Sequence, residues 1–159
     1  MSLPDGVRVG PAAELELQHH DVVAFAVAGR DLPAAVAAHG GRIPARAAVL
    51  VLADGLVPPA GTLPTAYVAE RVRARAVGCL AGPGVAGALA EGSAVVAAAQ
   101  DEPFLTQLAA ALRSAGLEVT TTREVAAVEL AGTAANAETL AAAAGGSDQA
   151  RQPRRPRAA

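Results

Sequence analysis

Short apolar runs alternate along this chain with segments of helical pattern. Each run is bounded by Gly, Pro, Asp or Ser, and continuous apolar runs favour strands that helices cover on both faces. The expected strands are Val7–Val9, Val22–Ala28, Ala47–Ala53, Val77–Ala81, Ser93–Ala99 and Leu117–Thr122, and the expected helices between them are Leu32–His39, Pro64–Arg73, Val85–Glu91 and Glu102–Ala115. This alternation predicts an α/β fold with a mostly parallel sheet and helices on both faces.

The pattern changes after the last expected strand. Arg123–Ala144 is mostly helical by composition, and Asp101 is a good N-cap for the helix before it. The last residues are polar and contain Pro and Arg, so residues 147–159 are expected to form a disordered tail. The chain therefore divides into a sheet domain over residues 1–122, a helical segment over residues 123–146 and the tail.

Ligands of parallel sheets bind at the carboxyl ends of the strands, which directs attention to three turns. These are Ala28–Asp31, Asp54–Leu56 and Gly82–Gly84. Gly82 and Gly84 allow a ligand to approach the backbone closely, although an ordinary turn is the more frequent meaning of Gly-Pro-Gly. Arg30 is the best-placed cation for a phosphate at this edge, although an exposed surface arginine is the commoner case.

Composition excludes several classes of protein. The chain has 159 residues and is 52% hydrophobic, but much of that fraction is alanine, so its core depends on close packing. A net charge of −2 predicts no general affinity for nucleic acid, and no apolar run has the length of a membrane span. With no signal peptide visible and one cysteine, the expected location is cytoplasmic.

Two further residue types carry little expected chemistry. Cys79 falls in a strand pattern and is expected to be buried and inert. His19 and His20 diverge on a helix, which argues against a metal site. Arg71, Arg73 and Arg75 follow a helix and are most simply solvated, and the four arginines of the tail favour a solvated tail over contact with RNA or a membrane.

Several segments, in order, resemble the NAD(P)-dependent glycerol-3-phosphate dehydrogenase family. The residues AVAGRDLPAAV (Ala26–Val36) resemble AVPSxxLRxVL, and IPARAAVLVLADGLVPPAG (Ile43–Gly61) resembles IPxxAxVVxxAKGLExxTG. LAGPGVAGALAEG (Leu80–Gly92) resembles LSGPxFAxExAxG, and VELAGTAANA (Val128–Ala137) resembles VELGGALKNV more weakly. The resemblance covers about residues 3–146 and implies a partial Rossmann-type fold.

The resemblance also implies a function and site residues. The family interconverts dihydroxyacetone phosphate and sn-glycerol 3-phosphate with NAD or NADP, in glycerophospholipid precursor metabolism. By resemblance, Gly82, Gly84 and Asn136 would contact the phosphorylated substrate, and Ala28, Arg30 and Ala86 the cofactor. Residues 1–122 would be a truncated Rossmann-like domain without its first βαβ unit, and residues 123–146 the first helix of the family's C-terminal helical domain.

Departures from the family pattern are more informative than the matches. The family's two lysines correspond to Asp54 and Ala135, and the chain contains no lysine at all. Aspartate repels an anionic substrate, alanine moves no proton, and losing one acid–base group costs about 10²–10⁴ in rate. The segments that resemble the family come after its first strand, so they include no counterpart of the family's N-terminal GxGxxG turn, which holds the dinucleotide diphosphate. We therefore expect an impaired or inactive relative that binds NAD(P) poorly by itself.

Two other functions remain open from the sequence. The chain could be one subunit of a split heteromeric dehydrogenase, with a partner docked at an exposed sheet edge. It could also be a non-enzymatic module that binds a small anion or a nucleotide at the Gly-Pro-Gly turn. The ketopantoate reductases are an alternative ancestry, which fits that turn less well.

Overall fold

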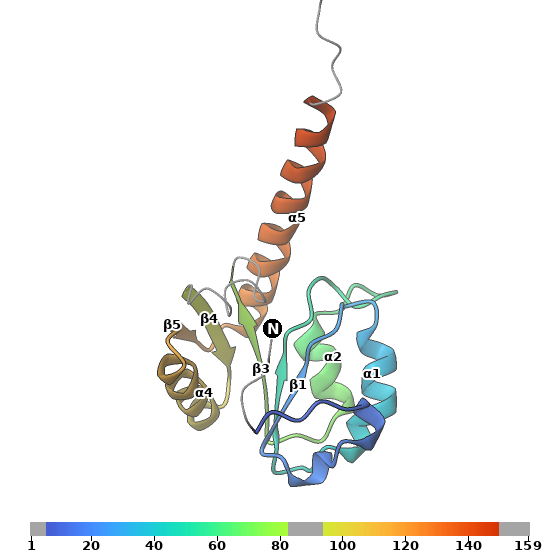
Figure 1. Ribbon diagram of the computed structural model, residues 1–159, viewed down its shortest axis with the longest axis vertical. Helices are drawn as coiled ribbons and strands as arrows, with labels where there is room; N and C mark the ends of the chain where they lie inside the picture. The colour runs from blue at the N-terminus through green and yellow to red at the C-terminus, as the bar shows by residue number, and fades with distance from the viewer. Residues whose placement is uncertain (1–5, 83–93, 150–159) are drawn as a thin grey trace, which may run out of the picture.

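A five-stranded sheet forms the centre of the computed structural model, which describes residues 6–82 and 94–149 (Figure 1). The strands lie in the order β1-β2-β3-β4-β5. Three of the neighbouring pairs are parallel, and β3–β4 is antiparallel, which confirms a mostly parallel sheet. The strands are β1 Val22–Phe25, β2 Ala48–Val51, β3 Ala76–Ala81, β4 Ala94–Ala99 and β5 Glu118–Thr122. The carboxyl ends of β1, β2 and β3 therefore lie at one end of the sheet, and the carboxyl ends of β4 and β5 lie at the opposite end.

Helices cover both faces of the sheet, as expected for a Rossmann-type fold. On one face α1 and α2 bury residues that include Leu32, Val36 and Val68, against alternate positions of β2 such as Val49. On the other face α4 buries Phe104 and Leu105 against the remaining positions. The helices are α1 Leu32–His39, α2 Pro64–Arg71, α4 Glu102–Ser114 and α5 Val125–Gln149.

The alanine-rich core is packed closely. A Cβ atom added to Gly78 on β3 would lie 2.7 Å from the Ala98 carbonyl oxygen of β4 and 3.1 Å from Cε1 of Phe104. Ala97, Ala98 and Ala99 are fully shielded from solvent. Small residues let the strands and helices approach one another, so many short contacts replace the large side chains that this chain lacks.

The local signals around α4 are confirmed. Asp101 Oδ1 accepts the backbone N–H of Phe104 over 2.8 Å, which makes it the N-cap of this helix. Gly116 follows the helix with a φ of +89°, a conformation that favours glycine.

Three expectations about element boundaries are corrected. Val7–Val9 is no strand: Val7 and Val9 are exposed, and none of the described strands pairs with them. Helix α2 ends at Arg71, because Val72 turns to extended backbone and buries its side chain. Helix α5 continues to Gln149, so residues 147–149 are helical and not part of the expected tail. The expected helix Val85–Glu91 and residues 150–159 lie outside the described residues.

Two arginines fasten the N-terminal segment to the body of the molecule. Arg42 donates to the carbonyl oxygens of Ala12, over 3.3 Å, and of Leu15. Arg46 donates to the carbonyl oxygen of Gln18 over 2.8 Å. Within the described residues, no helix combines the length and the hydropathy that crossing a membrane requires.

Candidate functional site

The turns that follow β1 and β2 pack directly on each other at the shared carboxyl edge. The Gly29 N–H donates to the Asp54 carbonyl oxygen over 3.0 Å. A Cβ atom at Gly29 would lie 2.8 Å from that oxygen and 2.9 Å from the Gly55 carbonyl oxygen. Only glycine fits this contact without movement of the backbone. The fold thus brings together two of the three turns expected to face a ligand.

Helix α5 supplies the third part of this edge. The Asn136 side-chain Nδ2 donates to Asp54 Oδ1 over 2.9 Å, although the two residues are 82 positions apart. Asp54, Gly82 and Asn136 line one small cavity. The structure therefore gathers the described residues expected to contact substrate, together with one expected lysine position. Gly84 and Ala86 lie outside the described residues, and the roles of all these residues stay predictions.

This cavity is small and acidic. Its volume is about 20 Å³, the space of one water molecule. Asp54 and Glu129 both line it, and its described lining contains no arginine and no histidine. Such a lining opposes an anion, because each carboxylate raises the cost of bringing a second negative charge close. This cavity therefore does not suit a small anion; the Gly-Pro-Gly turn, for which that function was considered from the sequence, lies mostly outside the described residues.

Glu129 is a buried acid that sequence reasoning missed. Its side chain is 9% exposed, and it reaches from α5 to the first turn of α2. The carboxylate accepts the Thr65 N–H over 2.9 Å and the Thr65 hydroxyl over 2.5 Å. Burial raises the pKa of Glu129, while the two hydrogen bonds from Thr65 act in the opposite direction. No local sequence pattern predicts this contact, because the two residues are 64 positions apart in the chain.

Glu129 completes α2 in place of a local N-cap. Leu63 occupies the N-cap position and has no side chain that could accept a hydrogen bond. The first N–H groups of a helix have no partner within the helix, and the partial positive charge of the N-terminus favours an anion. Glu129 thus caps α2 and fixes α5 to the body of the protein. Seven residues further along α5, Asn136 makes the second contact, with Asp54.

Cys79 is buried and unreactive, as expected. It lies on β3, is 2% exposed and lines the same cavity as Glu129. Burial, and then the nearby negative charge of Glu129, raise the pKa of its thiol to about 12. A thiol with that pKa is not a nucleophile near neutrality.

The residues expected to contact a cofactor are not gathered at this cavity. Arg30 does not line it; its side chain is 82% exposed and pairs with Asp31 over 3.7 Å. Ala28 is exposed and likewise absent from the lining. A side chain at Gly29 would have no room, because the carbonyl oxygens of Asp54 and Gly55 fill that space. Ala28 and Arg30 therefore share no cavity with Asp54 and Asn136 in the described residues.

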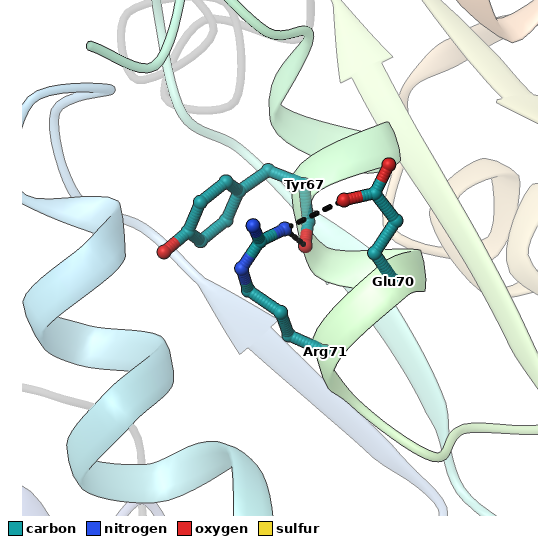
Figure 2. Close-up of polar contacts among 3 residues, drawn as sticks. All are labelled: Tyr67, Glu70 and Arg71. Carbon is teal, nitrogen blue, oxygen red and sulfur yellow. Dashed lines mark hydrogen bonds and ion pairs between the residues drawn. The ribbon is translucent and has the colours of Figure 1, made fainter. Parts of the chain in front are cut away.

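Of the three arginines at the end of α2, Arg73 is exposed, as expected, whereas Arg71 and Arg75 have partners. Figure 2 shows the Arg71 guanidinium stacked on the Tyr67 ring, 3.9 Å from its centroid. The same group donates to the Tyr67 carbonyl oxygen over 3.1 Å and to Glu70 over 2.8 Å. Residues 6–82 and 94–149 contain no cluster of His, Cys, Asp and Glu that could hold a metal ion.

A larger groove lies at the other end of the sheet. Its volume is about 470 Å³, and it runs along α2 toward the start of β3 and the residues after β4. Small apolar side chains line most of it, with an ion pair of 4.0 Å between Arg75 and Asp101. Size alone would favour this groove, but none of the residues singled out for ligand contact lies there. The alanines that line the groove also form no sequence pattern that would indicate a binding site.

Comparison with known proteins identifies a relative of the chain. No protein-family model matches it. It is 32% identical over 143 residues to the glycerol-3-phosphate dehydrogenase [NAD(P)+] of Sinorhizobium fredii. That alignment covers 89% of this chain and 43% of the relative, so the chain spans less than half the length of the relative.

Solved structures share the fold. The glycerol-3-phosphate dehydrogenase of Saccharomyces cerevisiae gives a TM-score of 0.69 at 18% identity, covering 82% of this chain and 40% of that one. The Plasmodium falciparum enzyme gives 0.68 at 17% identity, covering 78% and 36%. A ketopantoate reductase from Ralstonia eutropha is more distant in fold, at 0.51 and 19% identity, covering 69% and 36%. In sequence, the chain is thus similar to part of a glycerol-3-phosphate dehydrogenase [NAD(P)+], and it shares its fold with solved glycerol-3-phosphate dehydrogenases.

Proposed function

We propose that this chain is a glycerol-3-phosphate dehydrogenase-like scaffold that does not catalyse hydride transfer by itself. The observation that supports this most directly is the hydrogen bond of 2.9 Å between Asn136 and Asp54. A residue that repels phosphate stands at one expected lysine position and is already paired with the expected substrate residue. Ala135 stands at the other expected lysine position and has no side-chain proton to transfer.

We also propose that the chain binds NAD(P) weakly or not at all on its own. The relative is named as NAD(P)-dependent, but Arg30, the expected cofactor cation, is 82% exposed and paired with Asp31, and Ala28 does not line the cavity of Asp54 and Asn136. A dinucleotide bound in a Rossmann-type fold depends on amide donors at a helix N-terminus, next to glycines that leave room for the phosphates. The segments that resemble the family do not include its N-terminal diphosphate-binding turn.

A coupled assay tests the proposal. The purified chain is mixed with NADH and dihydroxyacetone phosphate, and NADH oxidation is followed by absorbance. We expect no rate above the blank, while the Sinorhizobium fredii enzyme serves as the positive control. Sustained oxidation that scales with the concentration of the chain would overturn the proposal.

The free edge of the sheet supports a second candidate, a component of a two-chain dehydrogenase. β1 pairs only with β2 in the described structure, and Val22 on it is 47% exposed. Unpaired strand edges attract another strand, so a partner could extend the sheet there. Here residues 1–122 would be one part of a composite Rossmann-like domain, and α5 the first helix of the C-terminal helical domain.

Native association distinguishes this candidate. A tagged chain is recovered from its own cells under mild conditions, and the mass of the complex is measured. A stoichiometric partner that confers dehydrogenase activity would support the two-chain enzyme. Recovery of a lone monomer would count against it.

A further inference from the structure

Among the described strands, the second edge strand of the sheet, β5, also has no neighbour on its outer side, and its groove shares no lining residue with the cavity of Asp54 and Asn136. β5 is the last strand in the order and pairs with β4 from Ala94↔Glu118 to Ala98↔Thr122. No other described strand lies beside it. Thr120 and Thr121 on β5 are exposed, and the strand contains no proline. Such an edge presents backbone donors and acceptors that a further strand can use.

A groove accompanies this edge. It has a volume of about 360 Å³ and lies between α4 and the end of β5, which Figure 1 shows side by side at one margin of the molecule. Leu105 and Ala109, 6% and 1% exposed, form part of its lining. Hydroxyl groups add polar contacts from Thr106, Thr121 and Thr122. An apolar floor beside an edge strand matches the surface on which strand-addition domains hold an extended peptide.

The charged residues that line this groove favour an acidic ligand. Two arginines, Arg113 and Arg123, line it against one acid, Glu102. Arg113 Nη2 donates to the Val119 carbonyl oxygen over 2.7 Å, which holds its guanidinium beside the strand. Arg123 directly follows β5 and forms no ion pair with any described residue. Both guanidiniums can therefore meet a carboxylate that arrives from outside.

We propose that this groove binds an extended acidic peptide, added to the sheet beside β5. Arg113 is held at Val119, and Arg123 lies four positions further along the chain. Four positions span about 13 Å of extended backbone. Side chains of a strand alternate between faces, so two acids four positions apart lie on the same face. A ligand with that spacing pairs one carboxylate with each arginine. The site lies away from Asp54 and Asn136, and this binding is independent of dehydrogenase chemistry.

Peptide binding by the full chain tests the proposal. The probe is a fluorescein-labelled, terminally blocked Glu-Val-Thr-Val-Glu peptide, and the control is the same peptide with both Glu replaced by Lys. Fluorescence anisotropy should show saturable binding of the acidic peptide only. Arg123→Glu should weaken it about tenfold or more, because it replaces an attractive charge by a repulsive one. Arg73→Glu, at another exposed arginine outside the groove, should leave the affinity unchanged.

A second readout locates the bound peptide. Hydrogen–deuterium exchange should slow at Thr120–Thr122 when the peptide is bound, because a strand beside β5 protects its outward amides. The proposal is overturned by equal binding of the Lys peptide, by no binding up to about 1 mM, or by unchanged exchange at these residues. Displacement of the peptide by an equal concentration of inorganic phosphate would also overturn it and indicate a small-anion site.

Discussion

Glu129 is the side chain on which the docking of α5 most depends. Its two oxygens are occupied by the backbone N–H and the hydroxyl of Thr65, in a buried setting. An acid is usually expensive to bury, and here the two hydrogen bonds and the N-terminus of α2 offset that cost. The residue therefore acts as a remote helix cap rather than as a catalytic group.

Replacement of Glu129 by Ala should destabilise the protein by about 2–3 kcal/mol, because the Thr65 N–H and hydroxyl would be left buried without a partner. Glu129→Gln, which keeps a side-chain oxygen, should cost less. Urea denaturation followed by circular dichroism measures both variants. Equal stability of Glu129→Ala and wild type would show that water replaces the carboxylate.

Glu129 also makes stability depend on pH. Its pKa in the folded protein lies above the ordinary value of 4.5, so the folded state binds more protons than the unfolded state near that pH. Its contribution is complete below pH 4.5 and is lost as the pH rises through the folded pKa. The free energy of unfolding of the wild type should thus fall relative to that of Glu129→Gln as the pH is raised from about 4.5. Parallel urea titrations across this range provide the measurement, and identical slopes would contradict the assignment.

Cys79 should resist alkylation in the native protein. With a thiol pKa of about 12, about one molecule in ten thousand carries a thiolate at pH 8. Iodoacetamide should therefore label the chain in urea and leave it unlabelled without urea, as read by mass spectrometry. Since Cys79 is the single cysteine, labelling counts report this site alone. Complete native labelling within minutes would mean that β3 opens readily.

At the scale of elements, the start of α4 depends on a local cap. Asp101→Ala removes the acceptor for the Phe104 N–H and should cost about 1 kcal/mol. Asp31 stands at the same position before α1 but makes no cap hydrogen bond from its side chain. Asp31→Ala is therefore the matched control and should change stability by much less. Thermal melting measures the stability of both variants. Equal losses of stability would show that the Asp101 hydrogen bond does not stabilise α4.

At the scale of the whole molecule, stability rests on few large side chains. Phe104 is among the largest fully buried residues, in a core otherwise rich in alanine and valine. Phe104→Ala should cost about 3–5 kcal/mol, a large share of the roughly 5–15 kcal/mol that stabilises a typical domain. Leu130→Ala, at a residue that is 54% exposed, should have little effect. Urea titrations compare the two, and a small loss for Phe104→Ala would show that neighbouring alanines collapse into the space.

Orientation of the strands was only partly predictable. The apolar runs located β1 to β5 within a few residues, but a continuous run looks the same in a parallel and in an antiparallel strand. The reversal of β4 against β3 therefore appears only in the register of the structure. The prediction of a strand at Val7–Val9 was wrong, because alternating apolar residues form a strand only where a neighbouring strand pairs with them.

The sequence by itself determined the alternation of strands and helices, the cap at Asp101, the neighbouring positions of the turns after β1 and β2, and the resemblance to a dehydrogenase family. These features depend on local chemistry or on ordered motifs. Only the tertiary structure decided that Glu129 caps α2 from 64 residues away and that Asn136 binds Asp54 across 82 residues. Such contacts leave no trace in local pattern, because they form only when packing of the whole sheet brings α5 alongside β3.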